Sequence, residues 1–155
     1  MDTRPAYSAP DWFTARILNP AVAALTRAGV SVLGSRVLRI RGRTSGVWRE
    51  TPVNLLTLRG ENYLVAARGE TQWVRNLRAS RQGELRVGST TQTFTAEELA
   101  DSEKAAVLRA YLRKWQWEVG AFFAGVGPDV SESELLTEGR RHPVFRIQFD
   151  PEGEG

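Results

Sequence analysis

Residues 35–68 read SRVLRIRGRTSGVWRETPVNLLTLRGENYLVAAR, and this stretch decides the fold. Apolar and polar residues alternate in it with a period close to two, which is typical of half-buried β-strands. Because the turn sequences GRTSG and RGEN interrupt the alternation, we predict separate strands over residues 35–41, 47–58 and 62–68. Pro52 has no N–H to donate to a neighbouring strand, so we expect an edge position or a bulge there.

The sequence on either side supplies helices. Helices are predicted at the N-terminus over residues 1–30 and after the third strand over residues 71–80. The strongest helical pattern covers residues 103–123 in the C-terminal half. Asp101 or Ser102 is the expected N-cap of the last helix.

A second hairpin and a closing strand complete the pattern. The hairpin is expected from strands at 84–88 and 91–99, and the closing strand covers 142–149, with Phe145, Ile147 and Phe149 on one face. Residues 125–141 are interpreted as a polar loop with about one helical turn, and residues 150–155 as a flexible tail.

This order of elements predicts the fold class. Strands predominate in the middle of the chain and are expected to pair with their sequence neighbours, which favours an α+β protein with an antiparallel, partly closed barrel and helices packed outside it. A length of 155 residues fits a single domain over 1–155. The N-terminus lacks a basic segment followed by an apolar run, and no stretch has the apolar length of a spanning helix, so we expect a cytoplasmic protein.

The charges point to an anionic partner. The formal net charge is +3, and between residues 36 and 86 the arginines far outnumber the glutamates. Arginine supplies nineteen of the 21 basic residues, which reflects either genomic base composition or the fit of planar guanidinium groups to phosphate and carboxylate.

Several classes of chemistry lack their motifs. The chain has no cysteine, no Gly-rich dinucleotide fingerprint, no phosphate loop and no G-x-S-x-G elbow. One histidine, His142, is too few for a His-rich metal site, and we interpret it as structural. No metal site is predicted.

The turn Gly42-Arg43-Thr44-Ser45-Gly46, followed by Arg49, is the strongest candidate site. A glycine-flanked turn can point backbone N–H groups into one concavity, and hydroxyl and guanidinium groups can then complete an oxyanion shell. Spacing alone favours a plain hairpin turn whose arginines are solvated.

This segment resembles the split β-barrel family of deazaflavin (coenzyme F420)-dependent nitroreductases and quinone reductases. The matching pattern is G-R-[KT]-S-G-x-x-R-x-x-P over residues 42–52, then V-A-A at 65–67 and W-x-x-N-L at 73–77. The resemblance covers about residues 36–95 and implies an antiparallel split barrel related to FMN-binding proteins.

The resemblance also implies roles for individual residues. The coenzyme phosphate and acidic tail would be held by Arg43, Thr44, Ser45, Gly46 and Arg49. The deazaflavin ring would lie along Ala66, Ala67 and Arg68, with the pocket closed by Trp73 and Asn76. Two features depart from the family pattern: Thr44 replaces a common lysine, and residues 68–72 form a shorter loop.

Aromatic side chains on the predicted long helix are candidates for the acceptor side of the site. Tyr111, Trp115 and Phe122 fall at helical spacing, which is also what core packing would produce. Trp117 points elsewhere and is a candidate for an acceptor pocket or an interface. By family analogy the substrate-side candidates are Tyr111, Trp115 and Trp117. No general acid is evident, so the proton for the product is expected to come from water or from a tyrosine such as Tyr111.

The expected function is transfer of a hydride from a reduced deazaflavin to a small-molecule acceptor such as a quinone, a nitroaromatic or an activated enone. The alternatives are an FMN-dependent reductase of the same fold and a non-catalytic protein that binds a cofactor or other ligand. We expect no nucleic-acid partner, no stable membrane insertion beyond peripheral contact by the N-terminal helices, and a monomer or homodimer.

Overall fold

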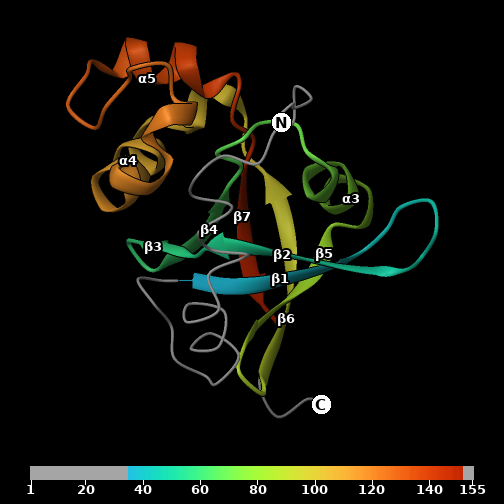
Figure 1. Cartoon of the computed structure of the whole chain (residues 1–155). Helices are drawn as coiled ribbons and strands as arrows, with labels where there is room; N and C mark the ends of the chain where they lie inside the picture. The colour runs from blue at the N-terminus through green and yellow to red at the C-terminus, as the bar shows by residue number, and fades with distance from the viewer. Residues whose placement is uncertain (1–34, 152–155) are drawn as a thin grey trace, which may run out of the picture.

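The computed structural model describes residues 35–151, so the helices expected in residues 1–30 and most of the expected tail lie outside the described residues. It contains one sheet of seven strands with helices around it (Figure 1). The strands are β1 (Ser35–Arg41), β2 (Trp48–Asn54), β3 (Leu56–Leu58), β4 (Glu61–Val65), β5 (Gln82–Val87), β6 (Thr90–Glu98) and β7 (Val144–Phe149). The helices are α3 (Gln72–Ser80), η1 (Asp101–Glu103), α4 (Ala105–Val119), η2 (Gly120–Phe122) and α5 (Glu132–Gly139).

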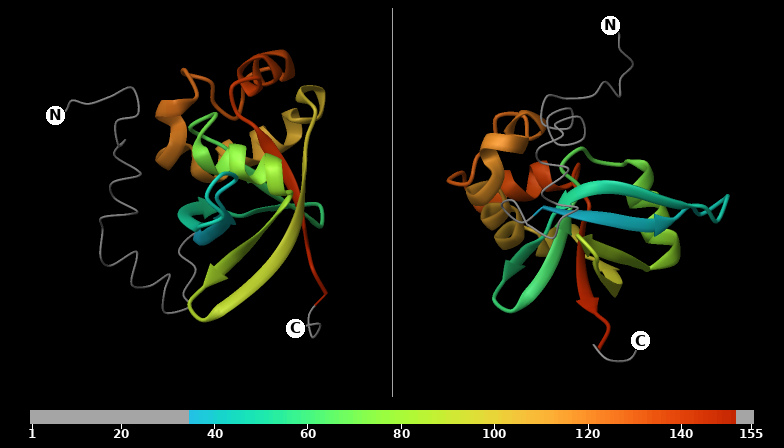
Figure 2. Two further views of the ribbon diagram at one scale, coloured as in Figure 1. Left: turned by 90° about the vertical axis from the view of Figure 1, so that its right-hand side faces the viewer. Right: turned by 60° about the horizontal axis from the view of Figure 1, so that its bottom comes forward.

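The sheet is antiparallel throughout and has the order β2-β1-β5-β6-β7-β4-β3. Its two edge strands, β2 and β3, follow each other directly in the chain, and β2 also contacts β4. The sheet must therefore curl until its edges approach each other, and the result is the split barrel that was predicted. Figure 2 shows this curvature from two further directions.

The prediction of a single strand over 47–58 was wrong, because the structure has two strands there, β2 and β3. The chain changes partner at Leu55: Asn54 pairs with Ser35 of β1, whereas Leu56 pairs with Tyr63 of β4. Alternation in the sequence does not reveal which neighbour each half of a strand will pair with. The expectation for Pro52 is confirmed, because β2 lies at the sheet edge.

The strand predicted over 62–68 also ends early, at Val65. Residues 66–69 form a turn in which the Gly69 N–H donates to the Ala66 carbonyl over 3.0 Å, and Gly69 has a φ of 83°. A positive φ costs glycine little, so Gly69 permits the turn that follows the strand.

The C-terminal helices differ from the prediction in two ways. The helix expected over 103–123 is α4 between two 3₁₀ turns, and Trp115 has a non-helical φ of −129°. Its N-cap is Lys104, not Asp101 or Ser102. The loop predicted over 125–141 contains the eight-residue helix α5, whose start is stabilised by a capping box between Ser131 and Glu134.

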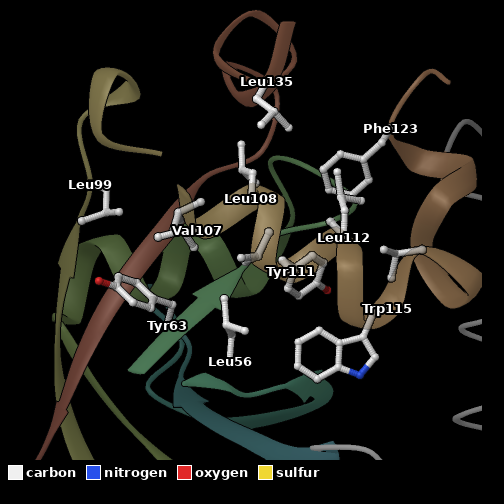
Figure 3. Close-up of a cluster of buried hydrophobic side chains, with 14 residues drawn as sticks. Leu56, Tyr63, Leu99, Val107, Leu108, Tyr111, Leu112, Trp115, Phe123 and Leu135 are labelled. Carbon is white, nitrogen blue, oxygen red and sulfur yellow. The ribbon is translucent and has the colours of Figure 1, made fainter. Parts of the chain in front are cut away.

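Two hydrophobic clusters fill the structure. One lies between the sheet and α3 and includes the inward residues Leu38, Ile40, Leu77 and Phe94. The other lies between β3, β4 and the helices α4 and α5, and contains Tyr111, Leu112 and Trp115 (Figure 3). Helix α3 and the pair α4–α5 therefore cover different parts of the sheet.

Candidate functional site

The turn between β1 and β2 is a tight, hydrogen-bonded loop. The Gly42 N–H donates to the Val47 carbonyl over 2.8 Å, the Gly46 N–H donates to the Gly42 carbonyl over 2.9 Å, and Ser45 Oγ accepts from the Val47 N–H over 3.1 Å. A Cβ at Gly42 would lie 2.8 Å from Ser45 Oγ and 3.3 Å from the Val47 carbonyl oxygen, so any other residue there would displace the Ser45 hydroxyl from its hydrogen bond or widen the turn. Gly46 has a φ of 75°, which favours glycine for its backbone freedom.

Helix α3 holds this turn in place. The Oδ1 atom of Asn76 accepts from the Arg43 backbone N–H over 3.0 Å and from Arg43 Nη1 over 2.8 Å. Arg43 Nη1 also donates to Gln72 Oε1 over 2.9 Å. Because Asn76 is only 4% exposed, its amide is a rigid anchor for a residue that lies 33 positions earlier.

A cavity of about 920 Å³ opens between the turn, strands β1 and β2, and helix α3. Apolar residues of β1, Leu38 and Ile40, contribute to its wall. The polar lining consists of Arg43, Thr44, Ser45, Arg49, Glu50, Thr51, Glu70, Thr71, Gln72, Arg75 and Asn76, with Gly42 and Trp73 completing it.

The charges around this cavity leave a net excess of positive groups. Glu50 forms salt bridges with Arg39 and Arg86, each with an N–O distance of 3.0 Å, and neither arginine lines the cavity. Glu70 forms a salt bridge with Arg78 at an N–O distance of 3.0 Å. The hydrogen bond from that guanidinium lowers the pKa of the Glu70 carboxyl.

The three arginines of the lining form no salt bridge within residues 35–151. In this described part of the chain Arg43 bonds only to neutral amides, and Arg49 and Arg75 have no ion pair within 4.0 Å, although the nearby charge of Arg75 adds to the lowering of the Glu70 pKa. Because both acids are paired with arginines outside the lining, the three arginines of the lining leave the cavity positive, and it favours an anion.

The structure brings most of the predicted tail-binding residues together. Arg43, Thr44, Ser45 and Arg49 line the cavity with Trp73 and Asn76, whereas Gly46 shapes the turn without lining it.

Of the three residues predicted to lie along a ring, Ala67 and Arg68 line a common cavity and Ala66 does not. Ala66 is buried and lines neither cavity: its N–H donates to the Pro143 carbonyl over 2.8 Å, and its carbonyl accepts from Gly69. Ala67 and Arg68 line a second, smaller cavity of about 60 Å³. The two cavities share Thr51, Thr71 and Trp73, so they adjoin.

The aromatic residues of α4 have three different environments. Tyr111 is buried and lines the second cavity. Trp115 is buried in the core beside Tyr111, with ring centroids 5.1 Å apart (Figure 3). Trp117 is 68% exposed, its Nε1 donates to the Lys114 carbonyl, and it lines neither cavity.

His142 has the structural position expected of it. It is buried, its ring stacks on Phe123 at 3.9 Å, Nε2 lies 2.7 Å from Glu138 Oε2, and Nδ1 lies 3.3 Å from the Ala66 carbonyl oxygen.

Sequence reasoning missed several lining residues, chiefly Gln72 and Arg75 on α3 and Asn54 and Thr71 in the second cavity. A signal for the first two was available, because residues 72, 75 and 76 have the i, i+3, i+4 spacing that puts side chains on one helix face. Nothing in the sequence marked Asn54, whose position depends on the partner change at Leu55.

Comparison with known proteins identifies the family. The model of the F420H(2)-dependent quinone reductase family matches residues 16–119, which is more than half of the chain. The chain belongs to this family. This reductase is therefore an oxidoreductase of the deazaflavin-dependent type, as the motifs of residues 42–77 predicted.

Solved structures confirm the fold of the reductase. An F420-H2 dependent reductase (FDR-A) is 18% identical with a TM-score of 0.53, and the match covers 74% of this chain and 94% of that one. A domain-swapped dimer is 17% identical with a TM-score of 0.54, covering 84% and 96%. HutZ, the heme storage protein from Vibrio cholerae, is 13% identical with a TM-score of 0.51, covering 86% and 91%. No curated protein matches the sequence.

Residues 35–151 contain neither a membrane-spanning helix nor a group of metal-binding side chains. None of their helices has the length and apolar character needed to cross a membrane. Among residues 35–151 no three His, Asp or Glu side chains are grouped so that they could hold a metal ion.

Proposed function

We propose that the reductase binds the phosphate-bearing tail of coenzyme F420 in the 920 Å³ cavity and reduces an organic acceptor beside it. The observation that carries this proposal is the charge pattern: Arg43, Arg49 and Arg75 face a cavity whose two carboxylates are already paired with other arginines. A phosphate or a carboxylate tail would supply the missing negative charge.

The polar groups present fit such a tail. Guanidinium groups form paired, planar hydrogen bonds with phosphate oxygens, and the hydroxyls of Thr44 and Ser45 add neutral partners from the same turn. Charge-assisted hydrogen bonds of this kind contribute about 1.5–3 kcal/mol each.

The apolar lining would position the ring of the coenzyme. Trp73 lines both cavities, and Ala67 and Arg68 line the smaller one, so a ring near Trp73 would lie at their junction. When bound, the reduced deazaflavin supplies the hydride. The protein residues orient it, and Leu38, Ile40 and Trp73 keep water away from the reacting face.

Reduction of a quinone also requires a proton. Tyr111 lines the smaller cavity, and we assign its phenol the role of delivering that proton to the reduced acceptor. The acceptors we propose are flat, electron-poor molecules: quinones, nitroaromatics and activated enones.

A side-by-side fluorescence titration tests this function. Oxidised F420 and FMN are titrated into the purified chain, and we expect tight binding of F420 and weak binding of FMN. A preference for FMN would identify an FMN-dependent reductase, and binding without reduction of any acceptor in a panel of quinones, nitroaromatics and enones would indicate a carrier. If neither coenzyme binds, the proposed function is wrong.

A further inference from the structure

Two residues that line the smaller cavity each carry a buried side-chain oxygen atom that has no hydrogen-bond partner among residues 35–151. They are Oδ1 of Asn54, at the end of β2, and Oγ1 of Thr71, immediately before α3. Buried polar atoms are nearly always hydrogen-bonded in proteins, so two unpartnered oxygens on residues that line one cavity of about 60 Å³ call for an explanation.

The direction of the Asn54 amide is set by a carboxylate. Asn54 is 6% exposed, and its Nδ2 donates to Glu118 Oε1 of α4 over 3.3 Å. A carboxylate only accepts hydrogen bonds, so the amide nitrogen must face Glu118. The carbonyl oxygen of Asn54 is consequently left as an acceptor for another group.

Thr71 is also free of its usual structural task. It is the N-cap residue of α3, a position where threonine normally accepts a hydrogen bond from the first turn of the helix. Here the Thr71 side chain makes no such bond. Its hydroxyl is both a donor and an acceptor, so it can donate to a carbonyl oxygen on a ligand.

We propose that Asn54 and Thr71 form a subsite for the edge of a planar ring that carries an N–H next to a C=O, as in an imide or an amide. Asn54 Oδ1 accepts from the N–H, and the Thr71 hydroxyl donates to the C=O. The volume of about 60 Å³ has room for such an edge but not for a whole ring system, whose remainder occupies the adjoining 920 Å³ cavity. This inference rests on the proposed function and adds the ligand chemistry that the second cavity recognises.

Two sources can supply this edge. The pyrimidine ring of a deazaflavin carries an imide, with its N–H between two carbonyls, and an acceptor substrate can carry a carboxamide. Both have the same donor and acceptor pair, so the test uses one ligand series for each source.

The coenzyme series measures dissociation constants by fluorescence titration. The ligands are oxidised F420 and its derivative methylated at the imide nitrogen, and the proteins are wild type, Thr71→Val, Thr71→Ser and Asn54→Leu. Thr71→Val preserves volume and removes the hydroxyl, and Thr71→Ser restores the hydroxyl. Thr95→Val, at an exposed position of β6, is the matched control, and thermal melting checks that each variant is folded.

If the coenzyme supplies the edge, Thr71→Val and Asn54→Leu each weaken F420 binding by about five- to tenfold, which corresponds to one neutral hydrogen bond. Thr71→Ser retains most of the affinity, and the methylated coenzyme binds wild type and Asn54→Leu equally, because it has no N–H to donate.

The acceptor series measures KM for 4-nitrobenzamide and for nitrobenzene. If the acceptor supplies the edge, F420 affinity is unchanged in all variants, and KM rises for the amide but not for nitrobenzene. If neither quantity changes in Thr71→Val and Asn54→Leu while wild type still binds F420, the subsite does not exist although the proposed function survives. If wild type does not bind F420 at all, both proposals fail.

Discussion

Arg43 Nη1 lies 2.8 Å from Asn76 Oδ1, and this hydrogen bond joins the β1–β2 turn to the buried side of helix α3. The same oxygen accepts from the Arg43 backbone N–H, so one amide fixes both the path of the turn and the direction of its arginine. The anion-binding groups are therefore held in position before any ligand arrives, which lowers the entropic cost of binding.

Asn76→Ala should lower both stability and coenzyme affinity. The substitution removes two hydrogen bonds and leaves the Arg43 N–H without its partner, so we expect the free energy of unfolding to fall by about 1–3 kcal/mol. Urea denaturation measures this change. Asn62→Ala is the control, because Asn62 Oδ1 accepts from an exposed threonine, Thr57, and its loss should cost less. Equal effects of the two substitutions would contradict the anchoring role.

Arg49→Ala should weaken coenzyme binding by more than tenfold without changing the melting temperature. Arg49 lines the cavity and has no ion pair with another residue in the described part of the chain, so its loss removes a ligand contact rather than a structural one. Fluorescence titration and thermal melting are the two measurements. Arg113→Ala, at an exposed position of α4, should change neither, and unchanged affinity in Arg49→Ala would disprove the phosphate site.

Coenzyme affinity should also fall as salt concentration rises. Arg43, Arg49 and Arg75 attract the anionic tail through charges that dissolved ions screen, with a screening length of about 8 Å at 0.15 M. Titrations between roughly 20 and 500 mM NaCl cover screening lengths above and below this value. They should show a steady loss of affinity in wild type. The slope should be smaller in Arg49→Ala, and identical slopes would indicate that Arg49 does not meet the tail.

Gly42→Ala should distort the β1–β2 turn that lines the large cavity, whereas Gly60→Ala should not affect that turn. A Cβ at Gly42 would lie 2.8 Å from Ser45 Oγ and 3.3 Å from the Val47 carbonyl oxygen, so either the Ser45 side chain gives up its hydrogen bond with the Val47 N–H or the turn widens. Gly60 has a φ of 82° but open space around it, and its substitution costs about 1 kcal/mol of stability alone. We expect coenzyme affinity to fall about tenfold or more in Gly42→Ala only. Similar affinities in both variants would show that the shape of this turn is unimportant.

Stability should decrease as pH falls below about 6.5, the ordinary pKa of histidine. Burial lowers the pKa of His142 in the folded protein, although the Glu138 hydrogen bond opposes this shift. The unfolded chain therefore takes up a proton at a higher pH than the folded protein does, and acidification favours unfolding.

Urea denaturation between about pH 5.5 and 7.5, on either side of that pKa, measures this dependence. His142 is the only histidine, so His142→Gln should make the free energy of unfolding less dependent on pH in this window. The same dependence in both proteins would show that His142 does not cause it.

Much of this architecture follows from local chemistry. The period-two alternation of residues 35–41 predicts β1, and the apolar spacing of Leu108, Leu112 and Trp115 predicts the buried face of α4. The glycines and arginine of residues 42–49 mark the turn and its charge, because backbone freedom and side-chain charge are properties of single residues.

Long-range packing accounts for the rest. The partner change at Leu55 depends on how far the sheet curls, and it brings Asn54 beside Thr71, 17 positions later in the chain. The positive character of the large cavity depends on Glu50 and Glu70 finding arginines elsewhere, which a count of charges along the chain does not reveal. Strand pairing and ion pairing depend on distances in three dimensions. The turn could therefore be predicted from the sequence, whereas the cavity beside it is formed only by the folded chain.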